Sequence, residues 1–81
     1  MSTAVTEEQI EKLVVESLET FGADPGQITR DATFEALDID SLDLAELSQI
    51  VQEQFGVELK GSDVAEVKTV QDAVKLIASR A

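Results

Sequence analysis

The 81-residue chain contains no cysteine and no histidine. The absence of cysteine excludes disulfides and thiolate metal sites. Without either residue type, the chain also lacks the most common general base and the most reactive nucleophile of enzyme active sites. Its 17 carboxylate side chains are too numerous for a catalytic pair to be singled out. We therefore expect no catalytic residues and no enzyme activity of the chain's own.

Long apolar segments are missing as well. No run approaches the roughly 18 apolar residues that a membrane span needs. The N-terminal sequence MSTAVTEEQI has no basic segment followed by an apolar one, as an export signal would. These features predict a cytoplasmic protein that makes no membrane contact.

Positive charge is scarce. Lysine and arginine together number 6 against 17 aspartates and glutamates, which gives a net charge of −11. Ten of the acids but only one base, Lys60, lie between Asp31 and Glu66, so this stretch carries nine of the eleven net negative charges. Such a chain repels the phosphates of nucleic acids. It suits partners with a basic surface, because complementary charge accelerates encounter and fixes orientation.

Apolar residues at helical spacing predict three longer helices within a single domain that covers residues 1–81. The expected approximate ranges are Thr6–Phe21, Asp40–Phe55 and Thr69–Ser79. Each begins with a capping-box pattern, in which two residues three positions apart bond each other's backbone N–H groups. The three pairs are Thr6 with Gln9, Asp40 with Asp43 and Thr69 with Asp72. Gly22 and Gly56 are suited to end the first two helices.

The segments between these helices lack a clear period. Gly22–Ile39 is long for a loop, and we expect its isolated apolar residues to hold it against the helices. These residues are Ile28, Phe34 and Leu37. A short helical element capped by Ser62 is expected at Ser62–Glu66. The predicted fold class is therefore all-α, a four-helix bundle with three longer helices and a short third one.

The stretch LDIDSLDL, at residues 37–44, allows two interpretations. In the first, Asp40 caps a helix and Ser41 is only a first-turn residue. In the second, Ser41 is an exposed hydroxyl presented for modification. A phosphorylated group is favoured there, because a helix N-terminus stabilises an anion by roughly 0.3–1 kcal/mol. Since the chain has no base to activate Ser41, another enzyme would perform the attachment.

A calcium loop in the same stretch is excluded. An EF-hand beginning at Asp38 would need an oxygen ligand at Leu42, a glycine at Asp43 and a bidentate glutamate at Gln49. No metal site is expected.

A second stripe lies on the predicted helix that starts at Asp40, about 100° around from Leu47. It comprises Leu42, Glu46, Gln49 and Glu53, with Asp43 at its edge. The core face of the same helix comprises Leu44, Leu47, Ile50, Val51 and Phe55. The stripe is either a solvated face or a surface that partners recognise.

Several segments of the chain resemble acyl carrier proteins. Asp-Ser-Leu opens SLDLAELSQIVQEQFGVEL, ITRDATFEAL precedes it, and VKTVQDAVKLI follows it. The resemblance covers Ile10 to Ile77. It implies that Ser41 receives 4′-phosphopantetheine from coenzyme A, and that acyl intermediates are carried as thioesters on the thiol of that group. Asp40 would cap the helix and help a transferase to position its metal ion.

The resemblance also implies partners. The stripe of Leu42, Asp43, Glu46, Gln49 and Glu53 would be recognised by basic patches on a phosphopantetheinyl transferase, a ketosynthase, an acyltransferase and tailoring enzymes. The carrier itself would be a monomer. Its pathway would make a polyketide or a specialised fatty acid, with general fatty acid synthesis as the next choice.

The same resemblance suggests that an acyl chain can fold back between the helices. Five residues would line its path: Phe34, Leu47, Val51, Val64 and Val67. Two positions depart from the family pattern, since Asp38 replaces a usual glycine and Gln49 a usual long apolar residue. The alternative from another class is an acidic helical adaptor without a prosthetic group, in which Ser41 is only a helix-start residue.

Overall fold

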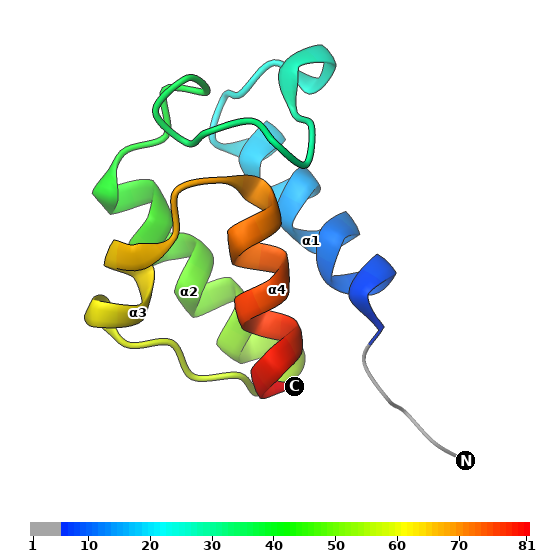
Figure 1. Cartoon of the computed structure of the whole chain (residues 1–81), viewed down its shortest axis with the longest axis vertical. Coiled ribbons are helices and arrows are strands. Elements are labelled where there is room, and N and C mark those ends of the chain that lie inside the picture. The colour runs from blue at the N-terminus through cyan, green and yellow to red at the C-terminus, as the bar shows by residue number, and fades with distance from the viewer. Residues whose placement is uncertain (1–5) are drawn as a thin grey trace.

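The computed structural model describes residues 6–81, and within that range the chain folds into four α-helices (Figure 1). They are α1 (Glu7–Thr20), α2 (Ser41–Phe55), α3 (Gly61–Glu66) and α4 (Val70–Arg80). A 3₁₀ turn, η1 (Pro25–Gln27), lies in the long connection between α1 and α2. In the described residues the only β-type pairing is an isolated bridge between Thr33 and Thr69. The prediction of an all-α fold with one short third helix is confirmed.

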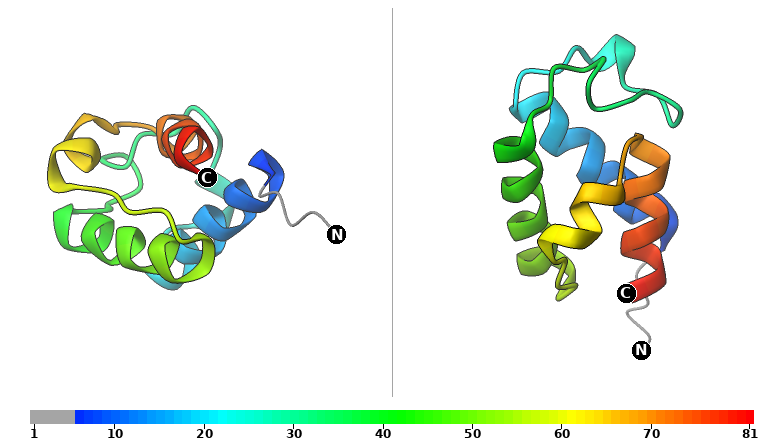
Figure 2. Two further views of the ribbon diagram at one scale, coloured as in Figure 1. Left: turned by 90° about the horizontal axis from the view of Figure 1, so that it is seen from below. Right: turned by 60° about the vertical axis from the view of Figure 1, so that its left-hand side comes forward.

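The four helices are arranged with α1 and α4 side by side and α3 on the side away from α1 (Figure 2). α3 lies beside α2, and the chain then turns back through the connection at residues 67–69 into α4. No helix in residues 6–81 is long and apolar enough to cross a lipid bilayer. The bundle therefore has a flank formed by α2 and α3, separate from the pairing of α1 with α4.

Capping explains where the longer helices begin. Thr6 accepts the Gln9 N–H, and Gln9 accepts the Thr6 N–H, both at 3.1 Å. Thr69 and Asp72 make the same reciprocal pair before α4, at 3.1 and 3.2 Å. Gly56, with φ of +70°, ends α2 in the left-handed conformation that glycine adopts at low cost. These helices begin and end within one residue of the predicted positions.

The short helix α3 differs from its prediction. It begins at Gly61, and Ser62 is a first-turn residue, not its cap. The N-cap position belongs to Lys60, whose backbone N–H donates to the Asp63 carboxylate at 3.0 Å. A helix of six residues has too few apolar positions to define a period, so sequence spacing could not locate its start.

The core contains the apolar faces of α1, α2 and α4. The apolar residues buried from these helices are Ile10, Val14, Leu18, Leu47, Val51, Val70, Ala73, Val74 and Ile77. Ile50, which was predicted to belong to the core face of α2, is only half-buried and lies outside this cluster. Its position on the helix turns it toward the edge of the buried face.

The connection between α1 and α2 is held in place by its own apolar residues, as predicted. Phe34 and Leu37 are buried and Ile28 packs against the core. Its backbone also pairs with the start of α4, since the Gln71 N–H donates to the Arg30 carbonyl at 2.8 Å.

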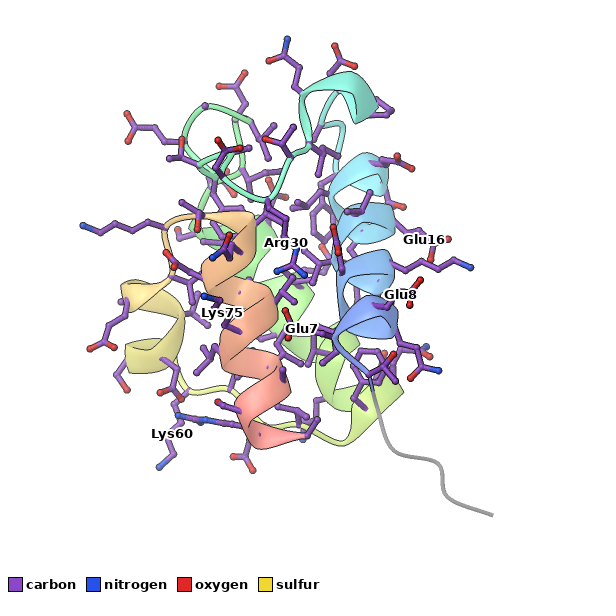
Figure 3. The ribbon with its side chains drawn as sticks, turned by 45° about the vertical axis from the view of Figure 1, so that its right-hand side comes forward. Glu7, Glu8, Glu16, Arg30, Lys60 and Lys75 are labelled. Atoms are coloured by element: carbon purple, nitrogen blue, oxygen red, sulfur yellow. The ribbon has the colours of Figure 1, made fainter. Side chains whose placement is uncertain are left out.

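Arg30 fastens the same connection to α1. Its guanidinium forms ion pairs with Glu7 at 3.1 Å and Glu11 at 3.2 Å. In Figure 3 the Arg30 side chain points toward Glu7. The hydrogen bond from Arg30 to Glu7 raises the pKa of the guanidinium above its usual value. The long loop is therefore anchored at both α1 and α4, and it delivers the chain to the start of α2.

Candidate functional site

Ser41 is the first residue of α2, and its side chain is exposed. The Asp40 carboxylate accepts the Asp43 N–H at 3.0 Å, and the Asp43 carboxylate accepts the Asp40 N–H at 3.4 Å. The first intrahelical bond runs from the Leu44 N–H to the Asp40 carbonyl. The N–H groups of Ser41 and Leu42 precede that bond, so they lie at the positive end of the helix. This arrangement presents a hydroxyl where an attached phosphodiester is electrostatically favoured.

The capping role of Asp40 can be tested by substitution. Replacing Asp40 with alanine leaves the Asp43 N–H without its carboxylate partner, so we expect a loss of about 0.5–2 kcal/mol in the free energy of unfolding. Urea denaturation followed by circular dichroism measures this loss. Asp40→Asn is the control, because asparagine is an equally good cap and should unfold within a few tenths of a kcal/mol of the parent. Equal stabilities of Asp40→Ala and Asp40→Asn would contradict the role of the side chain.

Asp38 has a backbone φ of +59°, and among the described residues other than glycine it alone is left-handed. Aspartate is one of the few residues that tolerate this conformation, for which glycine is the usual choice. The turn is closed by the Ile39 N–H, which donates to the Phe34 carbonyl at 2.9 Å. Asp38, which departs from the family pattern, therefore adopts a conformation that glycine favours and places a negative charge three residues before Ser41.

A surface groove begins at Ser41 and runs between α2 and α3. Its volume is about 510 Å³. Beneath it lies a small cavity of about 20 Å³, which has room for about one water molecule. The groove and the cavity share the residues Leu44, Ser48, Leu59, Val64 and Val67. The groove therefore leads from Ser41 toward the core, and the cavity at its base would have to widen to admit an apolar chain.

The predicted chain-lining residues divide into two groups. Leu47, Val64 and Val67 line the cavity. Phe34 and Val51 are packed in the core and line neither the groove nor the cavity. The cavity has further lining residues that the sequence did not indicate, namely Leu44, Ser48, Leu59, Ala73, Leu76 and Ile77. Helical spacing showed which face of α2 is buried, but not which part of that face lies toward α3.

α3 is held to the rest of the bundle by an ion pair at its first turn. Arg80, the last residue of α4, donates two hydrogen bonds to the Asp63 carboxylate at 2.7 and 2.8 Å. The hydrogen bond from Arg80, together with the bond from the Lys60 N–H, lowers the pKa of Asp63 below its usual value. α3 contributes no fully buried residue. The outer wall of the groove is therefore fastened mainly by charge and by the half-buried Val64 and Val67.

The exposed stripe on α2 continues from the same helix start. Leu42 is 77% exposed and is the large apolar side chain most open to solvent in the described residues. Glu46, Gln49 and Glu53 are exposed along the helix, whereas Asp43 is half-buried because its carboxylate also caps the helix. The structure thus brings together an exposed apolar residue, two free carboxylates and the Ser41 hydroxyl on one helix.

Comparison with known proteins identifies the family. The family model described as "Phosphopantetheine attachment site" matches residues 8–77. An acyl carrier protein of Zymomonas mobilis is 42% identical over 73 residues, which cover 89% of this chain and 90% of that relative. The chain belongs to the acyl carrier protein family. The acyl carrier protein of Solidesulfovibrio magneticus is 38% identical over 71 residues, 86% of this chain and 87% of the relative.

A solved structure of the family has the same fold. The 3,7-dioxo-octyl actinorhodin acyl carrier protein from Streptomyces coelicolor superposes with a TM-score of 0.74 at 30% identity. The match covers 99% of this chain and 94% of that one.

Membership of the family establishes that the chain is a non-catalytic carrier with a covalent 4′-phosphopantetheine, whose partners are a phosphopantetheinyl transferase and synthase enzymes. The family matches do not favour the alternative of an adaptor without a prosthetic group.

Proposed function

We propose that Ser41 is the residue that bears the 4′-phosphopantetheine, and that the chain carries acyl intermediates of a polyketide pathway. The observation that most directly supports attachment at Ser41 is the location of this residue. It is exposed at the N-terminus of α2, and it also lines the groove between α2 and α3. The actinorhodin carrier, similar over 99% of this chain, supports the polyketide pathway.

The residues around Ser41 fit the group that we place there. The phosphopantetheine supplies a terminal thiol, which the cysteine-free chain lacks. Asp40 and Asp43 keep the helix start in place, and the N–H groups of Ser41 and Leu42, which precede the first intrahelical bond, would favour an anion at this end of the helix. Leu44, Val64 and Val67 provide apolar surface along the groove, which shields an attached chain from water.

The attachment site is tested by loading the whole chain. The apo protein is incubated with coenzyme A, magnesium and a broad-specificity phosphopantetheinyl transferase. We expect intact mass to rise by one phosphopantetheine, and fragmentation to place the group in the peptide that contains residues 40–43. A group located on another serine, or no addition to the folded protein by two different transferases, would refute the proposal.

We also propose that Leu42, Glu46 and Glu53 form the surface that partner enzymes dock on, with Gln49 and Asp43 beside them. All three side chains are exposed on the helix that begins at Ser41, which supports this role. Carboxylates steer a partner with a basic patch into position, and Leu42 offers an apolar contact at the end of the surface nearest Ser41. A polar Gln49 in place of a long apolar residue points to partners with a less apolar docking patch. The partners that we infer are a ketosynthase, an acyltransferase and tailoring enzymes. We infer also that the carrier is a monomer.

Charge reversal tests this surface. The changes Glu46→Lys and Glu53→Lys are each expected to lower the kcat/KM of the transferase for the carrier about tenfold at low salt, because a steering charge becomes repulsive. The loss should shrink at high salt, where charges are screened. The matched control is Glu16→Lys on α1, where the same change is made on a side chain that points away from the bundle (Figure 3). Equal effects at positions 16, 46 and 53 would show that only net charge matters.

A further inference from the structure

Ser48 interrupts the apolar wall of the cavity beneath the groove. Among the nine described residues that line the cavity, the other eight are leucine, isoleucine, valine or alanine. Ser48 also lines the groove above, where Ser41 is the other residue with a hydroxyl. The two serines are seven positions apart, which is about two helical turns and about 10 Å along α2, so they lie on nearly the same face. A polar group therefore stands beside the path of a chain tethered at Ser41.

The Ser48 hydroxyl is free to change its partner. It donates to the Leu44 carbonyl at 3.1 Å, and it is partly buried. The Leu44 carbonyl also accepts the α-helical hydrogen bond from the backbone N–H of Ser48, which lies four residues later. Turning the hydroxyl toward the groove therefore leaves no acceptor unsatisfied. An oxygen of the attached acyl chain can therefore accept the Ser48 hydrogen bond, and no buried polar group is left without a partner.

Ser17 shows what the same bond does elsewhere. Its hydroxyl donates to the Leu13 carbonyl at 2.8 Å, and the residue is buried. Ser17 lines neither the groove nor the cavity, so its hydroxyl has no space to turn toward. The two serines make equivalent bonds to their helices and differ in whether a ligand can reach them.

We propose that Ser48 is a specificity-determining residue that donates a hydrogen bond to a ketone oxygen of the attached acyl chain. The groove then retains oxo chains in preference to saturated chains of the same length. A saturated chain offers the hydroxyl no acceptor, and Ser48 keeps its bond to Leu44 while the aliphatic wall receives the chain. This inference rests on the proposed attachment at Ser41, and it names ketone-bearing acyl groups as the preferred cargo.

The test compares chains that differ only in one oxygen. The parent, Ser48→Ala, Ser48→Thr and the matched control Ser17→Ala are loaded with octanoyl-phosphopantetheine, or with the same chain bearing a ketone at carbon 3, 5 or 7. Hydroxylamine cleaves each thioester, and its rate is measured both on the protein and on free pantetheine that carries the same acyl group. The rate on free pantetheine is then divided by the rate on the protein. This protection factor reports how well the groove retains the chain, and the division removes intrinsic reactivity.

In the parent, at least one oxo chain is expected to be protected about 2- to 10-fold better than octanoyl, the gain that one hydrogen bond provides. Ser48→Ala should remove that preference and leave the protection of octanoyl unchanged. Ser48→Thr, which keeps a hydroxyl, and Ser17→Ala should both retain the preference.

A preference that survives Ser48→Ala, or the absence of any preference in the loaded parent, would overturn the role of Ser48 and leave the carrier function intact. A parent that accepts no group at Ser41 would overturn the proposed attachment site as well, and intact mass distinguishes these outcomes before any cleavage is measured.

Discussion

A chain in which Ser41 is replaced by alanine is expected to accept no phosphopantetheine, because the substitution removes the oxygen that would form the phosphodiester. Ser41 is exposed and lies one residue after the cap, so the change should leave the free energy of unfolding within about 0.5 kcal/mol of the parent. Intact mass after incubation with coenzyme A, magnesium and a transferase measures the first effect, and urea denaturation measures the second.

Ser62→Ala provides the matched control for that experiment. Ser62 is an exposed serine in the first turn of α3, so it shares the local setting of Ser41 but has no Asp-Ser-Leu sequence around it. It should be loaded as fully as the parent. Loading of Ser41→Ala, or loss of loading in Ser62→Ala, would assign the attachment to a different serine.

Replacing Leu47 with alanine is expected to lower the free energy of unfolding by about 2–5 kcal/mol. Leu47 is 4% exposed and touches the cavity beneath the groove, so its removal enlarges an existing void in the core. Urea denaturation of the apo protein measures the loss. Loading with an octanoyl chain should recover part of it, since an apolar void accepts an apolar occupant.

Leu42→Ala is the control for this substitution, because it makes the same chemical change on the same helix at a side chain that is 77% exposed. Its cost should stay within about 0.5 kcal/mol. If both substitutions cost the same, Leu47 does not fill the core at the cavity. If octanoyl stabilises Leu47→Ala no more than the parent, the chain does not reach that part of the bundle.

The longer helices could be predicted from sequence because their signals are local. Ile10, Val14 and Leu18 lie one turn apart and are all fully buried, as their spacing requires. The capping pairs lie three residues apart, so the pattern that predicts them is also the pair that bonds. The start of α2 at Ser41, and hence the exposure of its hydroxyl, follows from the same local rule.

The remaining features depend on contacts between distant segments. The bond from the Gln71 N–H to the Arg30 carbonyl joins residues about 40 positions apart, and no spacing in the sequence indicates it. The Lys60 cap position of α3 depends on Asp63, which is itself held by Arg80 from the end of α4.

The candidate site divides in the same way. Ser41 and the exposed stripe follow from the resemblance and from helical geometry. Whether Val51 or Ser48 lines the groove depends on the angle at which α2 meets α3, and a single helix does not carry that information. Asp38 could be noted as a departure from the family, but only the structure shows that its backbone lies in the left-handed region that glycine favours.

The ion pair between Arg80 and Asp63 is expected to make the groove wall and the rest of the bundle respond oppositely to ionic strength. With a net charge of −11, the folded chain is destabilised by repulsion among its carboxylates, and added salt relieves that repulsion. The same salt weakens the Arg80–Asp63 pair, whose side chains are partly exposed, and so loosens α3. A fall in pH acts differently from added salt, because Asp63, with its lowered pKa, stays charged and keeps stabilising the fold until the pH falls through that lowered value. Added salt is therefore expected to weaken the attachment of the groove wall under conditions in which repulsion within the rest of the bundle is relieved.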